Sequence, residues 1–258
     1  MNQSIKNALL YLNIYRPIWR VYQQLARPGK RAITRAHADH YARFLKSDDL
    51  CFDIGANIGR KSTIFLELGA RVVAVEPSPE TVRELEARLG GNPKLTVVHA
   101  GVADTPGTAE LHVDTAFGGL ISSFRPDWSP GFDVTYEVPV TTLDVLIATY
   151  GVPAYCKIDV EGFELQVLRG LTQPIPVISI EYTNDNPTKK ALHVALDCMR
   201  YLQRFGDALV NFTPYDESRF LYDDWVQLSE AETRLYQVIK HTGWGDLFVD
   251  RRKAIRRP

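Results

Sequence analysis

The stretch DIGANIG, residues 53–59, places an acid at the end of an apolar run and two glycines in the turn that follows. Glycine allows a positive φ and a close approach of the backbone to a ligand. A turn between a strand and a helix binds nucleotides through its backbone N–H groups. Because Asp53 would repel a pyrophosphate at close range, it favours a ligand with a cationic amino group. The expected cofactor-binding residues here are Asp53, Gly55, Ala56, Asn57 and Gly59.

A second acid, Glu76, ends the next apolar run in VVAVEPSP. An acid at this strand end can accept hydrogen bonds from both hydroxyls of a ribose. A dinucleotide site would carry the pattern Gly-x-Gly-x-x-Gly, which DIGANIG lacks. S-adenosylmethionine joins an adenosine to a sulfonium and an amino group and has no phosphate, so it fits both acids. Pro77, Gly101 and Val102 are expected to border the adenosine, because loops that face a ligand follow strand ends.

A third polar group lies in YCKIDVEGFELQVLRGL, residues 155–171. Side chains alternate along a strand, so Lys157, Asp159 and Glu161 share one side. Three ionisable groups at the carboxyl edge of a sheet are candidates for chemistry rather than for core packing.

These residues need a sheet to position them, and short apolar runs do alternate with amphipathic stretches after residue 48. Seven strands are expected, at residues 50–54, 71–75, 95–98, 154–160, 176–181, 208–212 and 245–249. Ser78, Pro79 and Gly90 predict a helix between the second and third strands. Residues 108–140 resemble a β-hairpin excursion. The sequence therefore predicts an α/β fold with a mostly parallel sheet and helices on both faces.

Residues 1–46 are expected to form a basic helical arm, with one domain over residues 47–258. The arm is rich in Lys and Arg, and Ile18, Val21, Tyr22 and Leu25 share one helical face. Such an arm can pack on the domain or on a second copy in a homo-oligomer. Peripheral contact with a membrane surface is the alternative.

The composition is that of an ordinary globular protein, with 45% hydrophobic residues, 24% charged residues and a net charge of -1. No nucleic-acid partner is expected from this charge. The three cysteines, Cys51, Cys156 and Cys198, are too few and too scattered for a disulfide framework. The amphipathic N-terminus is neither a signal peptide nor a membrane span, so a cytoplasmic protein with buried free thiols is expected.

The motif order resembles that of the FkbM-type S-adenosylmethionine-dependent methyltransferases over about residues 48–182. The motifs are DIGANIG, VEPSPE, the pair Ser122-Ser123, TTLD, KIDVEGFELQVLRG and VISIE. The resemblance implies a class I, Rossmann-like fold and methyl transfer to oxygen, commonly a hydroxyl of a sugar or other natural product. It also places Lys157, Asp159 and Glu161 beside the methyl group. Arg60-Lys61 departs from the family pattern and indicates either an anionic acceptor or an exposed helix start.

Methyl transfer to an alcohol requires alignment of the two groups and removal of the hydroxyl proton. Asp159 or Glu161 could be the base, because a neighbouring acid raises a carboxyl pKa. Alternatively Asp159, Glu161 and Glu181 could hold magnesium, or Lys157 and Glu161 could form only a structural ion pair.

The acceptor is expected to be a small molecule or a glycan. Five aromatic residues could line its pocket or form the core of the excursion: Phe117, Phe124, Trp128, Phe132 and Tyr136. Two other functions stay open, a catalytically silent binding domain and an NAD-dependent oxidoreductase.

Overall fold

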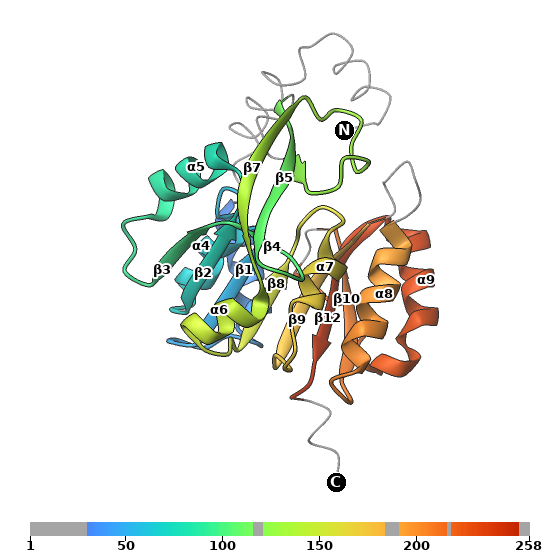
Figure 1. Ribbon diagram of the computed structural model, residues 1–258. Coiled ribbons are helices and arrows are strands. Elements are labelled where there is room, and N and C mark those ends of the chain that lie inside the picture. The colour runs from blue at the N-terminus through green and yellow to red at the C-terminus, as the bar shows by residue number, and fades with distance from the viewer. Residues whose placement is uncertain (1–29, 116–120, 184–190, 216–217, 253–258) are drawn as a thin grey trace.

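A twisted central sheet runs through the computed structural model, which describes residues 30–115, 121–183, 191–215 and 218–252 (Figure 1). Its strand order is β11-β10-β12-β9-β8-β1-β2-β3. The strands are β1 (Leu50–Ile54), β2 (Arg71–Glu76), β3 (Leu95–His99), β8 (Tyr155–Ile158), β9 (Val177–Thr183), β10 (Leu209–Pro214), β11 (Val226–Gln227) and β12 (Trp244–Asp250). The pairings from β3 to β9 are parallel, whereas β12 is antiparallel to both of its neighbours. The seven expected strands are confirmed, and the two-residue β11 adds an eighth at one edge.

Helices cover both faces of this sheet, as expected. The apolar residues of α6 (Leu143–Tyr150), α7 (Glu164–Arg169), α8 (Ala191–Gln203) and α9 (Ala231–Thr242) share one core with the strands. A short 3-10 helix, Leu228–Glu230, precedes α9. On the other face lie α3 (Lys30–Tyr41), α4 (Arg60–Glu67) and α5 (Pro79–Leu89). The side chain of Ser78 caps α5 by accepting a hydrogen bond from the N–H of Thr81, as the sequence predicts.

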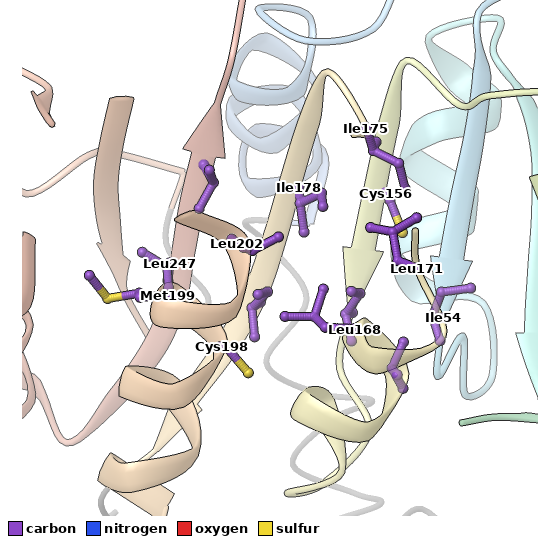
Figure 2. Close-up of a cluster of buried hydrophobic side chains, with 14 of the residues drawn as sticks. Ile54, Cys156, Leu168, Leu171, Ile175, Ile178, Cys198, Met199, Leu202 and Leu247 are labelled. Carbon is purple, nitrogen blue, oxygen red and sulfur yellow. The ribbon is translucent and has the colours of Figure 1, made fainter. Parts of the chain in front are cut away.

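Strand alternation divides the apolar side chains between the two faces. In β1, Phe52 and Ile54 enter the core under α6 to α9, and Cys51 enters the core under α3 to α5. Figure 2 shows part of the first core, where residues of α7 and α8 lie against β8, β9 and β12. All three cysteines are buried and free, which confirms the expectation for the thiols.

Helix α3 and the turn after it belong to the packed domain. Tyr41, Phe44 and Leu45 are buried in the same core as Phe65 and Tyr155. The boundary expected between residues 46 and 47 therefore falls inside the packed unit, and residues 1–29 of the expected arm lie outside the described residues. None of the helices in the described part of the chain is long and apolar enough to cross a bilayer.

The expected excursion forms a second sheet, which rises beyond the end of the central one in Figure 1. Its order is β4-β7-β5-β6, with β4 (Gly101–Val102), β5 (Gly107–Asp114), β6 (Ile121–Ser123) and β7 (Val134–Thr141). Leu111, Val113 and Val138 form a small core, with Phe124 and Tyr136 packed against it. The antiparallel pairing of β5 with β7 confirms the hairpin.

Candidate active site

A pocket lies where the carboxyl ends of β1, β2 and β8 meet the second sheet. Nine residues expected at the site line this pocket: Gly55, Asn57, Glu76, Pro77, Gly101, Val102, Asp159, Glu161 and Glu181. Four others do not line it: Asp53, Ala56, Gly59 and Lys157. The structure thus brings together both acidic groups that the sequence singles out, and the pocket lies between them.

The glycine turn after β1 is shaped by close backbone contacts. Gly55 has a φ of 77°, and a Cβ on it would overlap the carbonyl oxygen of Asp159. The N–H groups of Gly55 and Ala56 both donate to the carbonyl oxygen of Val75, at 2.9 and 3.0 Å. Gly59, with a φ of 76°, lies against the side chains of Leu85 and Leu89 in α5. Only glycine fits these two positions without strain, because both combine a left-handed φ with a crowded neighbour.

Asp53 is buried beneath the turn, with 1% of its surface exposed. Its Oδ2 accepts a hydrogen bond of 2.6 Å from the hydroxyl of Ser62 in α4. Burial raises the pKa of Asp53, although the bond from Ser62 and the charge of Lys157 act in the opposite direction. Asp53 thus bonds to α4 and does not line the pocket, and its attraction for a ligand amino group stays a prediction.

Glu76 reaches the pocket from the end of β2 and is held by two backbone donors. The N–H of Asn57 donates to its Oε2, and the N–H of Ser78 donates to its Oε1, each at 2.9 Å. Burial raises the pKa of Glu76 to about 7 despite these bonds. Each carboxylate oxygen keeps a second lone pair, so the side chain can still accept hydrogen bonds from a ligand hydroxyl.

Three further carboxylates converge at the pocket. One oxygen each from Asp159, Glu161 and Glu181 lie within 4.8 Å of one another. Burial and the charge of Asp159 raise the pKa of Glu161 to about 7, and a hydrogen bond of 2.9 Å from Trp128 Nε1 opposes that rise. Burial and the same charge raise the pKa of Glu181 well above its usual value. Such a cluster favours a cation or a shared proton.

Lys157 lies behind these carboxylates rather than beside them in the pocket. It is 3% exposed, and its Nζ contacts Asp159 Oδ2 at 2.8 Å and Asp246 Oδ1 at 3.5 Å. Burial opposes the ammonium charge, but the two carboxylates outweigh it and raise the lysine pKa well above its usual value. The structural ion pair expected between Lys157 and Glu161 is therefore wrong, because the partners of Lys157 are Asp159 and Asp246.

The second sheet and the segment after it also contribute to the pocket. Leu111, Ser122 and Ser123 line it without having been expected as site residues, and Phe124 lines it as one of the five aromatic residues expected there. Ser122-Ser123 belonged to the motif series, but its place at the pocket depends on the pairing of β5 with β6.

The remaining expected pocket residues have other places. Among the aromatic residues, Phe132 lies beside His112, 6.0 Å between ring centroids, and Phe117 falls outside the described residues. Arg60 is exposed at the start of α4, and the ammonium of Lys61 lies 5.5 Å from the ring centroid of Tyr41. Neither basic side chain lines the pocket.

A comparison with known proteins finds a similar methyltransferase. The hexuronic acid methyltransferase AglP of Haloferax volcanii is 26% identical over 137 residues, which are 52% of this chain and 54% of that protein. The chain thus spans about half the length of this curated relative.

Two solved structures are similar to the chain at low identity. A TehB-like SAM-dependent methyltransferase from Corynebacterium glutamicum has a TM-score of 0.49 at 12% identity, over 96% of this chain and 99% of that one. Aeropyrum pernix fibrillarin, solved with bound S-adenosyl-L-methionine, has a TM-score of 0.45 at 9% identity, over 83% and 73%.

The family model of the methyltransferase FkbM domain matches residues 53–217, more than half of the chain. The match begins at Asp53 and includes every pocket acid described above. The chain therefore belongs to the FkbM methyltransferase domain family.

Proposed function

We propose that the chain is an S-adenosylmethionine-dependent methyltransferase that methylates a hydroxyl oxygen of a sugar or a related polyhydroxylated natural product. The observation that carries the proposal is one pocket with two different acidic sides. Glu76 and the glycine turn make up what we call its first side, and Asp159, Glu161 and Glu181 make up its second side.

The first side suits the adenosine and methionine parts of the cofactor. Glu76 offers free lone pairs for the ribose, and Gly101 and Val102 line the pocket together with the Phe124 ring, which lies against Gly101. The charged residues that line the pocket in the described ranges are all acids, which favours a sulfonium over a phosphate. When bound, the cofactor supplies an electrophilic methyl group.

The second side suits a hydroxyl that must lose its proton. The pKa of about 7 at Glu161 matches the requirement that a general base be close to neutral. Lys157 holds Asp159 in place through their ion pair, so Asp159 and Glu161 present oxygens from a fixed turn. Adjacent carboxylates also accept hydrogen bonds from neighbouring hydroxyls, as a sugar offers them. The hexuronic acid named for the Haloferax relative is a sugar of this kind.

Membership of a methyltransferase family removes the support for an NAD-dependent oxidoreductase. The catalytically silent binding domain is the competing proposal, and it predicts cofactor binding without turnover. Magnesium at the three carboxylates stays a separate prediction, because general-base removal of the proton needs no ion.

Calorimetry with S-adenosylmethionine tests the first side of the pocket. The wild-type protein should bind, and Glu76→Gln should weaken binding about tenfold, since losing a hydrogen bond to a charged group costs about 1.5 kcal/mol or more. Glu110→Gln changes an exposed residue of β5 and is the matched control, with unchanged affinity. Absence of binding by the wild-type protein would overturn the proposal.

Transfer of an isotope-labelled methyl group to neutral sugars, hexuronic acids and amino sugars tests the second side. The label should appear on oxygen, and Glu161→Gln should lose turnover while it still binds the cofactor. Label on nitrogen or carbon would contradict O-methylation. Cofactor binding without transfer to any acceptor would favour the silent domain.

A further inference from the structure

We propose that Trp128 is a positioning residue that fixes the Glu161 carboxylate through its indole N–H and thereby connects the second sheet to the reaction centre. The positioning role rests on the proposed function of Glu161 as the base. The contact between the two residues stands independently of it.

The first observation is the hydrogen bond itself. The indole Nε1 of Trp128 donates to Oε2 of Glu161 at 2.9 Å, and Trp128 is 8% exposed. A nearly buried indole usually pairs its N–H, and a carboxylate is a strong acceptor for it. This bond fixes how the Glu161 carboxylate is oriented at the pocket that it lines.

The second observation is the fit between the Trp128 ring and the backbone after Glu161. Glu161 itself has a φ of 52°, and the next residue, Gly162, has a φ of 89°. A Cβ on Gly162 would overlap the Trp128 ring, so the ring lies directly against the glycine backbone. A left-handed backbone conformation is unfavourable at a residue other than glycine, and it persists only where contacts with the surrounding structure hold it. The indole is one of the groups that enforce it here.

The third observation is that neighbours of Trp128 hold the same turn. The hydroxyl of Ser123 donates to the carbonyl oxygen of Glu161 at 2.8 Å, and Arg125 Nη1 lies 3.5 Å from the carbonyl oxygen of Gly162. The Arg125 guanidinium lies 5.5 Å from the centroid of the Trp128 ring and forms an ion pair with Asp127. Residues 123–128 therefore contact the turn at residues 161–162 at three points: two backbone carbonyl oxygens and the carboxylate of Glu161.

A spectroscopic experiment tests the contact without any need for turnover. The full-length protein, labelled with ¹⁵N at tryptophan, should give a Trp128 indole signal that Trp128→Phe identifies by its absence. Glu161→Ala should shift this signal and speed its hydrogen exchange, because the acceptor is gone. The matched control Glu110→Ala, on the exposed side of β5, should leave the signal unchanged. The proposal would be overturned if the shift and the hydrogen exchange of the Trp128 signal were the same in Glu161→Ala as in the wild-type protein.

A kinetic experiment then separates positioning from packing. Trp128→Phe keeps a ring against Gly162 but removes the donor, and we expect kcat to fall by about 10-fold or more with cofactor affinity unchanged. Trp225→Phe is the matched control, because Trp225 packs with Phe44 and Phe220 and does not line the pocket. Equal kcat values for these two variants would show that Trp128 serves packing alone. If the wild-type protein has no turnover, the proposed function fails, while the indole signal still decides the contact.

Discussion

Replacement of Gly55 by alanine should lower the free energy of unfolding more than the same replacement at another glycine with a left-handed backbone. Gly55 has a φ of 77° and Gly206 a φ of 87°, so both alanines suffer the same backbone strain, about 1 to 2 kcal/mol. At Gly206 a Cβ would have no heavy atom within 4 Å. At Gly55 it would overlap the Asp159 carbonyl oxygen, and forced overpacking adds about 1 to 3 kcal/mol. The expected losses are therefore about 2 to 5 kcal/mol for Gly55→Ala and about 1 to 2 kcal/mol for Gly206→Ala.

Equilibrium unfolding in urea measures both losses, and similar slopes would show that the unfolded states are comparable. Calorimetry should also show weaker cofactor binding for Gly55→Ala alone, because the movement of Asp159 distorts the pocket. The reasoning is refuted if the two variants lose the same stability, since the overlap with Asp159 is the source of the larger loss expected for Gly55→Ala.

Three further predictions concern buried polar groups. Ser62→Ala should lower the free energy of unfolding by about 1.5 to 3 kcal/mol, measured in urea, because buried Asp53 loses its hydroxyl donor; no change would contradict this role. Burial raises the pKa of Glu164 from 4.5 to about 7. Its favourable contribution to the free energy of unfolding is therefore fully present below pH 4.5 and is lost as the pH rises through 7. Glu164→Gln should therefore reduce the stability difference between pH 5 and pH 8 by up to about 3 kcal/mol, and an unchanged difference would refute the assignment. If the pocket holds magnesium, calorimetry should show binding that Glu181→Gln weakens and EDTA should abolish turnover; activity unaffected by EDTA would exclude a required ion.

The strands of the central sheet could be predicted within one or two residues, because buried parallel strands are short apolar runs between helical patterns. The strand β11 could not, since Val226–Gln227 is too short for any periodicity. The sequence predicts a helical arm over residues 1–46 that packs on the domain or on a second copy, and α3 with the turn after it does pack on the domain. The boundary at residue 46 could not be predicted, because the three large apolar residues Tyr41, Phe44 and Leu45 enter the core through contacts with distant strands.

The sequence indicates which residues carry ionisable groups, but it indicates less well in which direction their side chains point. Asp53 shares its strand face with Cys51, so alternation places it under α4, where Ser62 contacts it. The pairing of Lys157 with Asp246 joins residues far apart in the chain and depends on β12 entering the sheet. The contribution of Ser122 and Phe124 to the pocket likewise depends on how the second sheet folds back. Such long-range pairings leave no local pattern in a single sequence.

The position of β12 has a consequence for the order in which the chain is made. β12 is bonded to β9 on one side and to β10 on the other, although both are synthesised before it. A growing chain therefore carries two open strand edges in this half of the sheet until Asp250 has been added. Lys157 meanwhile lacks Asp246, one of its two charge partners. The hydrogen bonds that hold Glu76 involve only residues 57–78, whereas the charge network of Lys157, which contacts Asp159, is complete only after β12 has joined the sheet.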